Sequence, residues 1–300
     1  MRLHLPGAAG DVDVRPETAG WQYAGLSVFR LAPGSTRRVR TRNTEVFVVP
    51  LSGHVSVEVT EPSGRRAALR LAGRRSVFAG ATDFLYAGPG SIVVVTSDVP
   101  AEVAVPSARC NTPRPTRYQP ADHVTVETRG AGVAAREVRN FGTPEAWPDA
   151  ERLMACEVIT PPGHWSSYPP HKHDASDPCM VANEEIYFFR ISGADMLTPS
   201  RDGFGFHRTY TGPEHERAGL APLDACHEVR DRDVVLVPHG YHGPCVAAPG
   251  YAMYYLNVLA GQGPRRSMAF CDDPAHAWIR ASWTAAQTAS SASAPKGSAG

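Results

Sequence analysis

The 300-residue sequence has no excess charge, no long apolar run and no closely spaced cysteine pair. Its 30 Lys and Arg balance 30 Asp and Glu, which gives no electrostatic reason to expect a nucleic-acid or membrane partner. No apolar run approaches the length that spans a bilayer. None of the six cysteines forms a C-x-x-C motif, so we expect reduced thiols that pack as small apolar side chains. No charged-then-apolar leader opens the chain, and we expect a cytoplasmic protein.

Glycine and proline, by contrast, are abundant, with 27 of each. Such a turn-rich chain favours many short strands over long helices. The clearest runs of β-branched and aromatic residues are 21–31, 46–49, 55–60, 92–96, 154–160, 186–189, 229–238 and 253–259. Short strands at this spacing predict an all-β sandwich or barrel.

A proline-rich stretch divides the chain. Residues 106–120 hold four prolines among polar and basic residues, a composition typical of a connection between domains. The sequence therefore predicts an N-terminal domain at 1–105 and a C-terminal domain at 121–284. Residues 285–300 are rich in Ala and Ser, and we expect them to be disordered.

Three residues of the second half suit a divalent metal ion. His171 and His173 are two apart, so on a strand both imidazoles point to one face. The apolar run 186–189 predicts the next strand, which can return Glu185 beside them. Two imidazoles and a carboxylate are a suitable ligand set for a transition metal.

A fourth candidate ligand follows a later strand. In 233–242, DVVLVPHGYH, an apolar strand ends at Pro238, Gly240 turns the chain and His242 follows. This hairpin can bring His242 back to the first three residues. Three His and one Glu leave one or two coordination positions open, which is the mark of a catalytic rather than a structural metal site.

The first half carries a related pattern without the histidines. Glu45 lies eight positions before Gly53, as Glu185 lies eight before Gly193. Arg40 and Arg42 occupy the places of His171 and His173, and arginine has no free lone pair for a metal. The sequence predicts two similar barrels, the first without a metal and with Glu45 paired to a nearby arginine.

The sequence resembles the cupin superfamily, and within it the 5-deoxy-glucuronate isomerase family of inositol catabolism, with the most specific matches in the second half. The resemblance covers about residues 20–280. The matching strings are SSYPPHKHD (166–174), EEIYFFR (184–190), DVVLVPHGYH (233–242), APGYAMYYLNVLAG (248–261) and DDPAHAWI (272–279). The spacing departs from the general cupin motif, since eleven residues separate His173 from Glu185. One departure from this family is Gly243, where proline is the more usual residue.

The resemblance implies a fold, a reaction and a cofactor. The fold would be a bicupin of two double-stranded β-helix (jelly-roll) barrels, the first degenerate. The reaction would be an aldose–ketose isomerisation of 5-deoxy-D-glucuronate to 5-dehydro-2-deoxy-D-gluconate. One divalent ion, Zn, Mn or Fe, held by His171, His173, Glu185 and His242, would stabilise an enediolate.

Such a reaction needs a base near the C2 proton of the sugar. The sequence leaves four candidates open, which are Glu184, His239, Tyr255 and Asp174. Glu184 would face away from Glu185 on a strand, which lowers its standing as the base. Tyr254 and Tyr255 alternate in the same way, so one of them faces the barrel interior.

The carboxylate of a sugar acid also needs a cation. The basic residues nearest to the site in sequence are Lys172, Arg190 and Arg208, with Tyr210 on the face of Arg208. The insert 174–184 is too long for a tight turn and predicts a flap at the barrel mouth, with Asp174 and Asp177 near the substrate.

The same ligand set permits other functions. A cupin dioxygenase could hold Fe(II) with three His and one Glu, and another sugar-acid isomerase or a sugar-binding sensor could share the site. The lack of a basic patch argues against a DNA-binding regulator. The partner that we expect is a small sugar acid, with no nucleic acid and no membrane, and a homodimer is compatible with the sequence.

Overall fold

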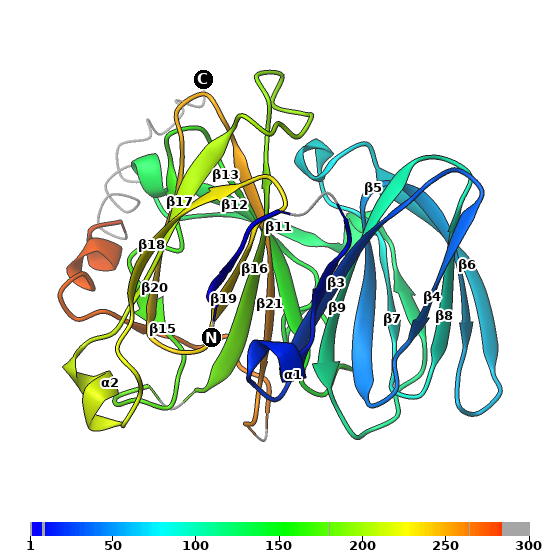
Figure 1. Cartoon of the computed structure of the whole chain (residues 1–300), viewed down its shortest axis with the longest axis horizontal. Coiled ribbons are helices and arrows are strands. Elements are labelled where there is room, and N and C mark those ends of the chain that lie inside the picture. The colour runs from blue at the N-terminus through cyan, green and yellow to red at the C-terminus, as the bar shows by residue number, and fades with distance from the viewer. Residues whose placement is uncertain (1, 8–9, 180, 264, 284–300) are drawn as a thin grey trace, which may run out of the picture.

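The computed structural model describes residues 2–7, 10–179, 181–263 and 265–283, and the tail 285–300 lies outside them. Two β-barrels lie side by side (Figure 1). Short helices are few, so the all-β prediction is confirmed. Within the described residues, no helix has the length and apolar character needed to cross a membrane.

The first barrel is built from the N-terminal part of the chain. Its elements are β2 (Val12–Val14), α1 (Pro16–Ala19), β3 (Ala24–Leu31), β4 (Ser35–Arg40), β5 (Thr44–Thr60), β6 (Arg66–Arg74), η1 (Val77–Ala79), β7 (Phe84–Ala87), β8 (Ile92–Ser97), β9 (Ala101–Arg109) and β10 (Arg117–Gln119). The runs 46–49 and 55–60 are parts of the single long strand β5. Residues 106–109 and 117–119 of the predicted connection belong to β9 and β10 of this barrel.

The second barrel holds the remaining elements. They are β1 (His4–Leu5), η2 (Ala121–His123), β11 (Thr125–Arg129), η3 (Gly132–Ala134), β12 (Arg136–Asn140), β13 (Met154–Thr160), β14 (Trp165–Ser166), β15 (His171–Lys172), β16 (Asn183–Ile191), β17 (Phe204–Tyr210), α2 (Pro213–Arg217), β18 (Asp224–Arg230), β19 (Val234–Val237), β20 (Tyr241–Ala247), β21 (Met253–Gly261) and β22 (Cys271–Asp272). One sheet runs β1-β19-β16-β21-β13-β12-β11, and the facing sheet runs β18-β17-β20-β15-β22. The predicted strand 229–238 is two strands with a turn between them.

Both faces of the central strands are buried, which explains their continuous apolar runs. In β16, Ile186 and Phe188 pack in a core shared by the two barrels, whereas Tyr187 and Phe189 pack inside the second barrel. In β5, Val46 and Val48 pack inside the first barrel. Figure 1 shows β3 and β9 beside β16 and β21 where the barrels meet.

Two glutamates fasten the barrels to each other in a matching way. Glu45 on β5 is buried and accepts hydrogen bonds from the backbone N–H groups of 151–153 (2.6–2.9 Å) and from the Tyr86 hydroxyl (2.7 Å). Glu184 on β16 accepts from the backbone N–H groups of 22–24 (2.6–2.8 Å). The prediction that Glu45 pairs with an arginine is therefore wrong. The contacts that Glu45 makes match those of Glu184, whereas the spacing of the internal repeat aligned Glu45 with the next residue, Glu185.

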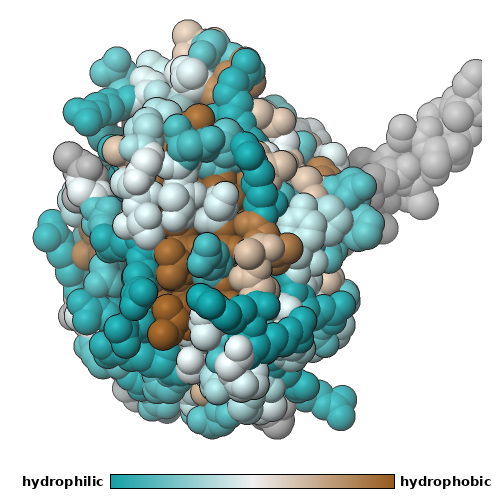
Figure 2. Space-filling view, turned by 90° about the vertical axis from the view of Figure 1, so that its right-hand side faces the viewer, coloured by the Kyte–Doolittle hydropathy of each residue, from teal (hydrophilic) through white to brown (hydrophobic). Residues whose placement is uncertain are grey.

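The outer face of the first barrel is shown in Figure 2. Apolar side chains gather in the middle of this face within a hydrophilic surround. Val39 on β4 and Leu69 on β6 are partly buried against the core of this barrel. The site described next belongs to the other barrel.

Candidate metal centre

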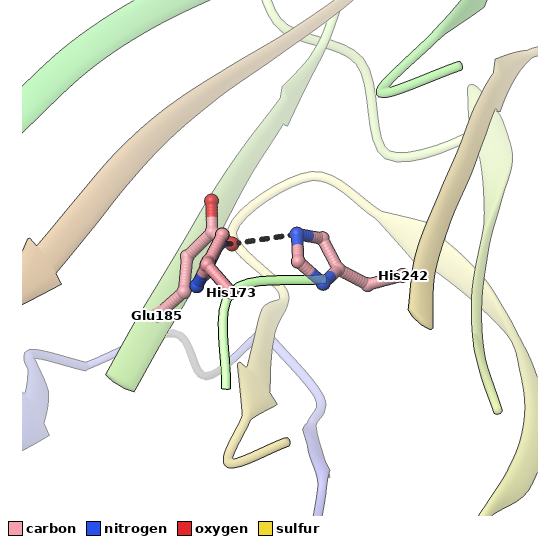
Figure 3. A group of neighbouring side chains, drawn as sticks. All are labelled: His173, Glu185 and His242. Carbon is pink, nitrogen blue, oxygen red and sulfur yellow. Dashed lines mark hydrogen bonds and ion pairs between the residues drawn. The ribbon is translucent and has the colours of Figure 1, made fainter. Parts of the chain in front are cut away.

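A carboxylate and two imidazoles meet inside the second barrel. His173, Glu185 and His242 are all buried, and their ligand atoms lie within 4.8 Å of one another. The Nε2 atoms of His173 and His242 are each 2.9 Å from Oε2 of Glu185. Figure 3 shows the His242 ring facing this carboxylate, with a dashed line for their contact, and His173 beside Glu185. We refer to these three residues as the trio.

Strand register explains why residues far apart in sequence meet here. Glu185 shares the inward face of β16 with Tyr187 and Phe189, because side chains alternate along a strand. His242 lies on β20 in the facing sheet, directly opposite His171 on β15. The hairpin predicted from 233–242 therefore does return His242 to the site.

Further hydrogen bonds orient the trio. Nδ2 of Asn257 donates to Oε1 of Glu185 (2.6 Å), which leaves Oε2 to the imidazoles. Nδ1 of His242 lies 3.3 Å from the carbonyl oxygen of Gly240. A carbonyl or amide partner of this kind sets ring orientation and ligand basicity at metal sites.

The fourth predicted ligand, His171, stands beside the trio. Its ring centroid is 4.6 Å from that of His242 and 6.4 Å from that of His173. Nδ1 of His171 donates to the carbonyl oxygen of Pro169 (3.1 Å), which leaves Nε2 with its lone pair. The structure thus gathers three of the four predicted ligands closely and places the fourth next to them.

Burial and the neighbouring charges shift the pKa values of Glu185 and His173 in the trio and of His171 beside it. Burial raises the pKa of Glu185, but His242 and His173 outweigh it and hold the pKa below its usual value. Burial lowers the pKa of His171, and the two other imidazoles lower it further. In these two groups the shifts favour the forms that bind metals, a carboxylate and a neutral imidazole. Burial lowers the pKa of His173, but the Glu185 carboxylate outweighs burial and raises it.

One atom indicates that a cation fits this position. Nε2 of His242 is buried and lies 2.9 Å from Oε2 of Glu185, yet it makes no hydrogen bond of acceptable geometry with any described residue. A buried polar atom without a hydrogen bond is rare. An ion held jointly by His173, Glu185 and His242 would satisfy this nitrogen.

A cavity of about 730 Å³ adjoins the trio. Glu185 and His173 line it together with side chains from β11, β12, β13 and β21, and with Met268, Phe270 and Arg280 near the C-terminus. The Phe270 ring lies 4.9 Å from the His171 ring, so this late segment lies at the end of the cavity beside the trio. Volumes of this order are typical of small-molecule sites.

Three hydroxyl groups form one wall of the cavity. The Ser167 hydroxyl lies 3.1 Å from the Tyr187 hydroxyl and 3.3 Å from the Tyr255 hydroxyl. Burial raises the pKa of both tyrosines, so they are hydrogen-bond donors rather than bases at neutral pH. Gly243 permits this arrangement, because a Cβ there would lie 1.8 Å from the Ser167 carbonyl oxygen and its φ is +88°.

Comparison with known proteins identifies the family. The model of the KduI/IolB family matches residues 4–279. The chain belongs to this family. It is 38% identical over 287 residues to the 5-deoxy-glucuronate isomerase of Geobacillus kaustophilus, with 95% of this chain and 96% of that protein covered. The corresponding protein of Halalkalibacterium halodurans is 35% identical over 269 residues, with 89% of this chain and 92% of that protein covered. The prediction that the chain belongs to this family and the prediction that it is an isomerase are both confirmed.

Solved structures agree with the fold. An IolB-like protein from Salmonella typhimurium superposes with a TM-score of 0.79 at 32% identity, covering 93% of this chain and 99% of that one. A variant of the Bacillus subtilis oxalate decarboxylase OxdC superposes with a TM-score of 0.60 at 10% identity, covering 90% of this chain and 79% of that one, which bears on fold alone. The predicted bicupin architecture is confirmed.

Of the four candidate bases, this KduI/IolB family member brings only Tyr255 to the cavity. Glu184 faces the other barrel and is bound to backbone N–H groups there. Nε2 of His239 donates to the carbonyl oxygen of Ala221 (2.9 Å), outside the cavity. Asp174 is buried and accepts from the backbone of Ser176 and Gly240 (2.9 and 2.7 Å). The predictions that these three residues reach the substrate are wrong.

The predicted carboxylate-binding residues are engaged elsewhere. Lys172 is buried and donates to the carbonyl oxygens of Ser176 and Asp177 (3.0 and 2.8 Å), so it fastens the insert that was predicted to be a flap. Arg190 pairs with Asp231 (2.7 Å) and with Glu102 of the first barrel. Each of these predictions is wrong because the charge is already matched by a nearby group.

Arg208 and Tyr210 face outward. On β17 the buried side chains are His207 and Thr209, and Arg208 is exposed with its guanidinium 4.4 Å above the Tyr210 ring. The Tyr210 hydroxyl donates to Asp273 (2.5 Å). The prediction that this pair lines the barrel is wrong, because the inward-facing residues of β17 are His207 and Thr209, each one position before Arg208 and Tyr210.

Two cysteines depart from the expectation of reduced thiols. Cys179, in the insert, forms a disulfide with Cys271, and their Cα atoms are 5.7 Å apart. The bond joins the insert to β22, which pairs with β15, the strand that carries His171. The remaining cysteines are unpaired, and Cys110, Cys156 and Cys245 are buried as predicted for small packing residues.

Sequence reasoning missed several residues of the cavity. Asn257 and Ser167 contact the site directly, and Arg136 lines the cavity. Asn257 could have been found, because it lies two positions after Tyr255 and so shares its face of β21. No local signal in the sequence marks Ser167, which reaches the two tyrosines from a loop.

Proposed function

We propose that the protein is a metal-dependent isomerase that converts 5-deoxy-D-glucuronate to 5-dehydro-2-deoxy-D-gluconate in myo-inositol degradation. Relatives that carry the name 5-deoxy-glucuronate isomerase align over nearly the whole chain. The observation that carries the proposal is the buried trio at a cavity of small-molecule size.

His173, Glu185 and His242 would hold one divalent ion, with His171 as the fourth ligand through its unengaged Nε2. Zn, Mn and Fe all accept this ligand set. When bound, the ion supplies Lewis acidity at the carbonyl end of the sugar.

The protein's own hydroxyl groups complete the site. Aldose–ketose exchange passes through an enediolate, in which negative charge develops on the C1 and C2 oxygens. The Tyr187 and Tyr255 hydroxyls stay protonated and are held by Ser167, so they can donate hydrogen bonds to these oxygens. Glu145 is the carboxylate outside the trio among the described cavity-lining residues, and it is the first base to test.

The proposal is tested by assaying the purified protein with 5-deoxy-D-glucuronate. We expect formation of the ketose, loss of activity after dialysis against a chelator, and recovery on addition of Zn, Mn or Fe. Dissolved oxygen should stay constant during turnover. Oxygen uptake would favour the dioxygenase alternative, and full activity of the chelated protein would refute the metal dependence.

Replacing Tyr255 by phenylalanine should lower kcat by about 100-fold, because a donor to the developing oxyanion is removed. The metal content should not change. Tyr254→Phe is the matched control, since Tyr254 faces the other barrel and donates to Glu157 (2.8 Å). An unchanged kcat in Tyr255→Phe would contradict the assigned role.

A further inference from the structure

Three guanidinium groups line the cavity, and two of them are neutralised. Arg129 pairs with Glu127 (2.6 Å), and Arg280 makes two hydrogen bonds to Asp272 (2.7 Å each). Arg136 donates to the carbonyl oxygen of Ala134 (3.2 Å) and lies 5.9 Å from the centre of the Trp283 ring. Among the residues that the structure describes, no carboxylate forms an ion pair with Arg136.

The backbone directs Arg136 into the barrel. Arg136, Val138 and Asn140 alternate along β12 and all line the cavity. Val138 is opposite Val158 on β13, and Val158 is opposite Tyr255 on β21. The side chain therefore belongs to the inner face of the sheet that also carries Tyr255 and Glu185.

A partly buried cation without an ion-pair partner is unfavourable unless an anion joins it. Glu127 is close enough for the charge of Arg136 to act on it, but its ion pair is with Arg129. Burial lowers the pKa of Arg136, and the neighbouring cations Arg280 and Arg129 lower it further, whereas the Tyr255 phenol acts in the opposite direction. A guanidinium remains charged under all physiological conditions. Its charge would be satisfied by a carboxylate that enters the cavity, and the planar fork of donors matches a carboxylate in two bonds.

The tyrosines connect Arg136 to the trio. The ring centroids of Tyr255 and Tyr187 are 5.1 Å apart, and those of Tyr187 and His242 are 6.1 Å apart. A ligand with a carboxylate at one end and a carbonyl at the other could therefore contact Arg136, the hydroxyl wall and the trio in sequence along one cavity.

We infer that Arg136 binds the carboxylate of the substrate and so makes the site selective for sugar acids over neutral sugars. This inference rests on the proposed function, because it takes the trio as the carbonyl-binding end. Arg136 thus takes the carboxylate-binding role that the sequence predicted for Lys172, Arg190 and Arg208. The charges of those three residues are engaged elsewhere or face outward.

The kinetic test compares Arg136→Gln with Arg208→Gln in the metal-loaded protein. Loss of a charge-assisted hydrogen-bond pair should raise KM for 5-deoxy-D-glucuronate by about 10- to 100-fold in Arg136→Gln, with a smaller change in kcat and no change in metal content. Arg208→Gln should change KM by less than about 3-fold, because Arg208 is exposed on the outer face of β17 and does not line the cavity. An equal rise in both variants, or an unchanged KM in Arg136→Gln, would overturn the inference.

A binding measurement separates this inference from the proposed function. Calorimetry with D-glucuronate and D-glucose should show the wild-type protein binding the acid at least about 10-fold more tightly. Arg136→Gln should lose this preference, and Arg136→Lys should retain part of it. Equal binding of both sugars by the wild-type protein overturns the inference even if the variants fail to fold. A preference that depends on Arg136, without isomerase activity, would refute the proposed function alone.

Discussion

Replacing His242 by alanine should leave the purified protein without its divalent ion and without isomerase activity. Nε2 of His242 is buried and lies 2.9 Å from the Glu185 carboxylate, yet it makes no hydrogen bond of acceptable geometry among the described residues. Removing it takes away a ligand and leaves a space in a buried site. Several kcal/mol of charge stabilisation would be lost with the ion, which corresponds to a decrease in kcat of about 1,000-fold or more.

The measurement is metal analysis together with turnover on 5-deoxy-D-glucuronate. His239→Ala is the matched control, because His239 is three positions away in the sequence but bonds Ala221 outside the cavity. It should keep full metal content and activity. His171→Ala belongs to the same series and should reduce metal content, as expected of a fourth ligand. Full metal content in a folded His242→Ala protein would refute the ligand assignment.

The sequence was informative where the argument depended on alternation along a strand. The separation of Glu185 from Glu184, and of Tyr255 from Tyr254, follows from the period of two in β16 and β21. The same period places Arg208 on the outer face of β17, because its neighbour His207 faces inward. Alternation assigns the two faces of a strand only when one inward residue is known, and in β16 that residue is Glu185, the candidate ligand beside the histidines.

The partners of charged residues could not be predicted in this way. Arg190 meets Glu102, 88 positions earlier, and Glu45 meets the backbone of 151–153, more than 100 positions later. Such contacts exist only because two barrels pack face to face, and neither sequence neighbourhood encodes the other. Arg136 carries no signal in the sequence for the same reason, since only the three-dimensional arrangement shows that it has no ion-pair partner among the described residues.

Glu45→Gln should lower the thermal midpoint of unfolding by roughly 5–10 °C. The Glu45 carboxylate is fully buried and accepts four hydrogen bonds, three of them from backbone N–H groups of the other barrel. An amide presents one oxygen and turns its NH₂ group toward donors, so at least one N–H group is left unsatisfied. Each such loss costs about 1–3 kcal/mol, and in a chain of this size 1 kcal/mol shifts the midpoint by roughly 2–4 °C.

Glu184→Gln provides the comparison, because it perturbs the equivalent contact from the opposite barrel. Glu184 is half-buried and accepts from the backbone of 22–24, so water can satisfy part of what the variant loses. Its midpoint should fall by less than that of Glu45→Gln, as measured by calorimetry on the metal-loaded proteins. Metal content and kcat should stay at wild-type values in Glu184→Gln, since Glu185 faces the opposite side of β16. A large loss of kcat with an unchanged midpoint would instead return Glu184 to the candidate bases and require the substrate to enter between the barrels.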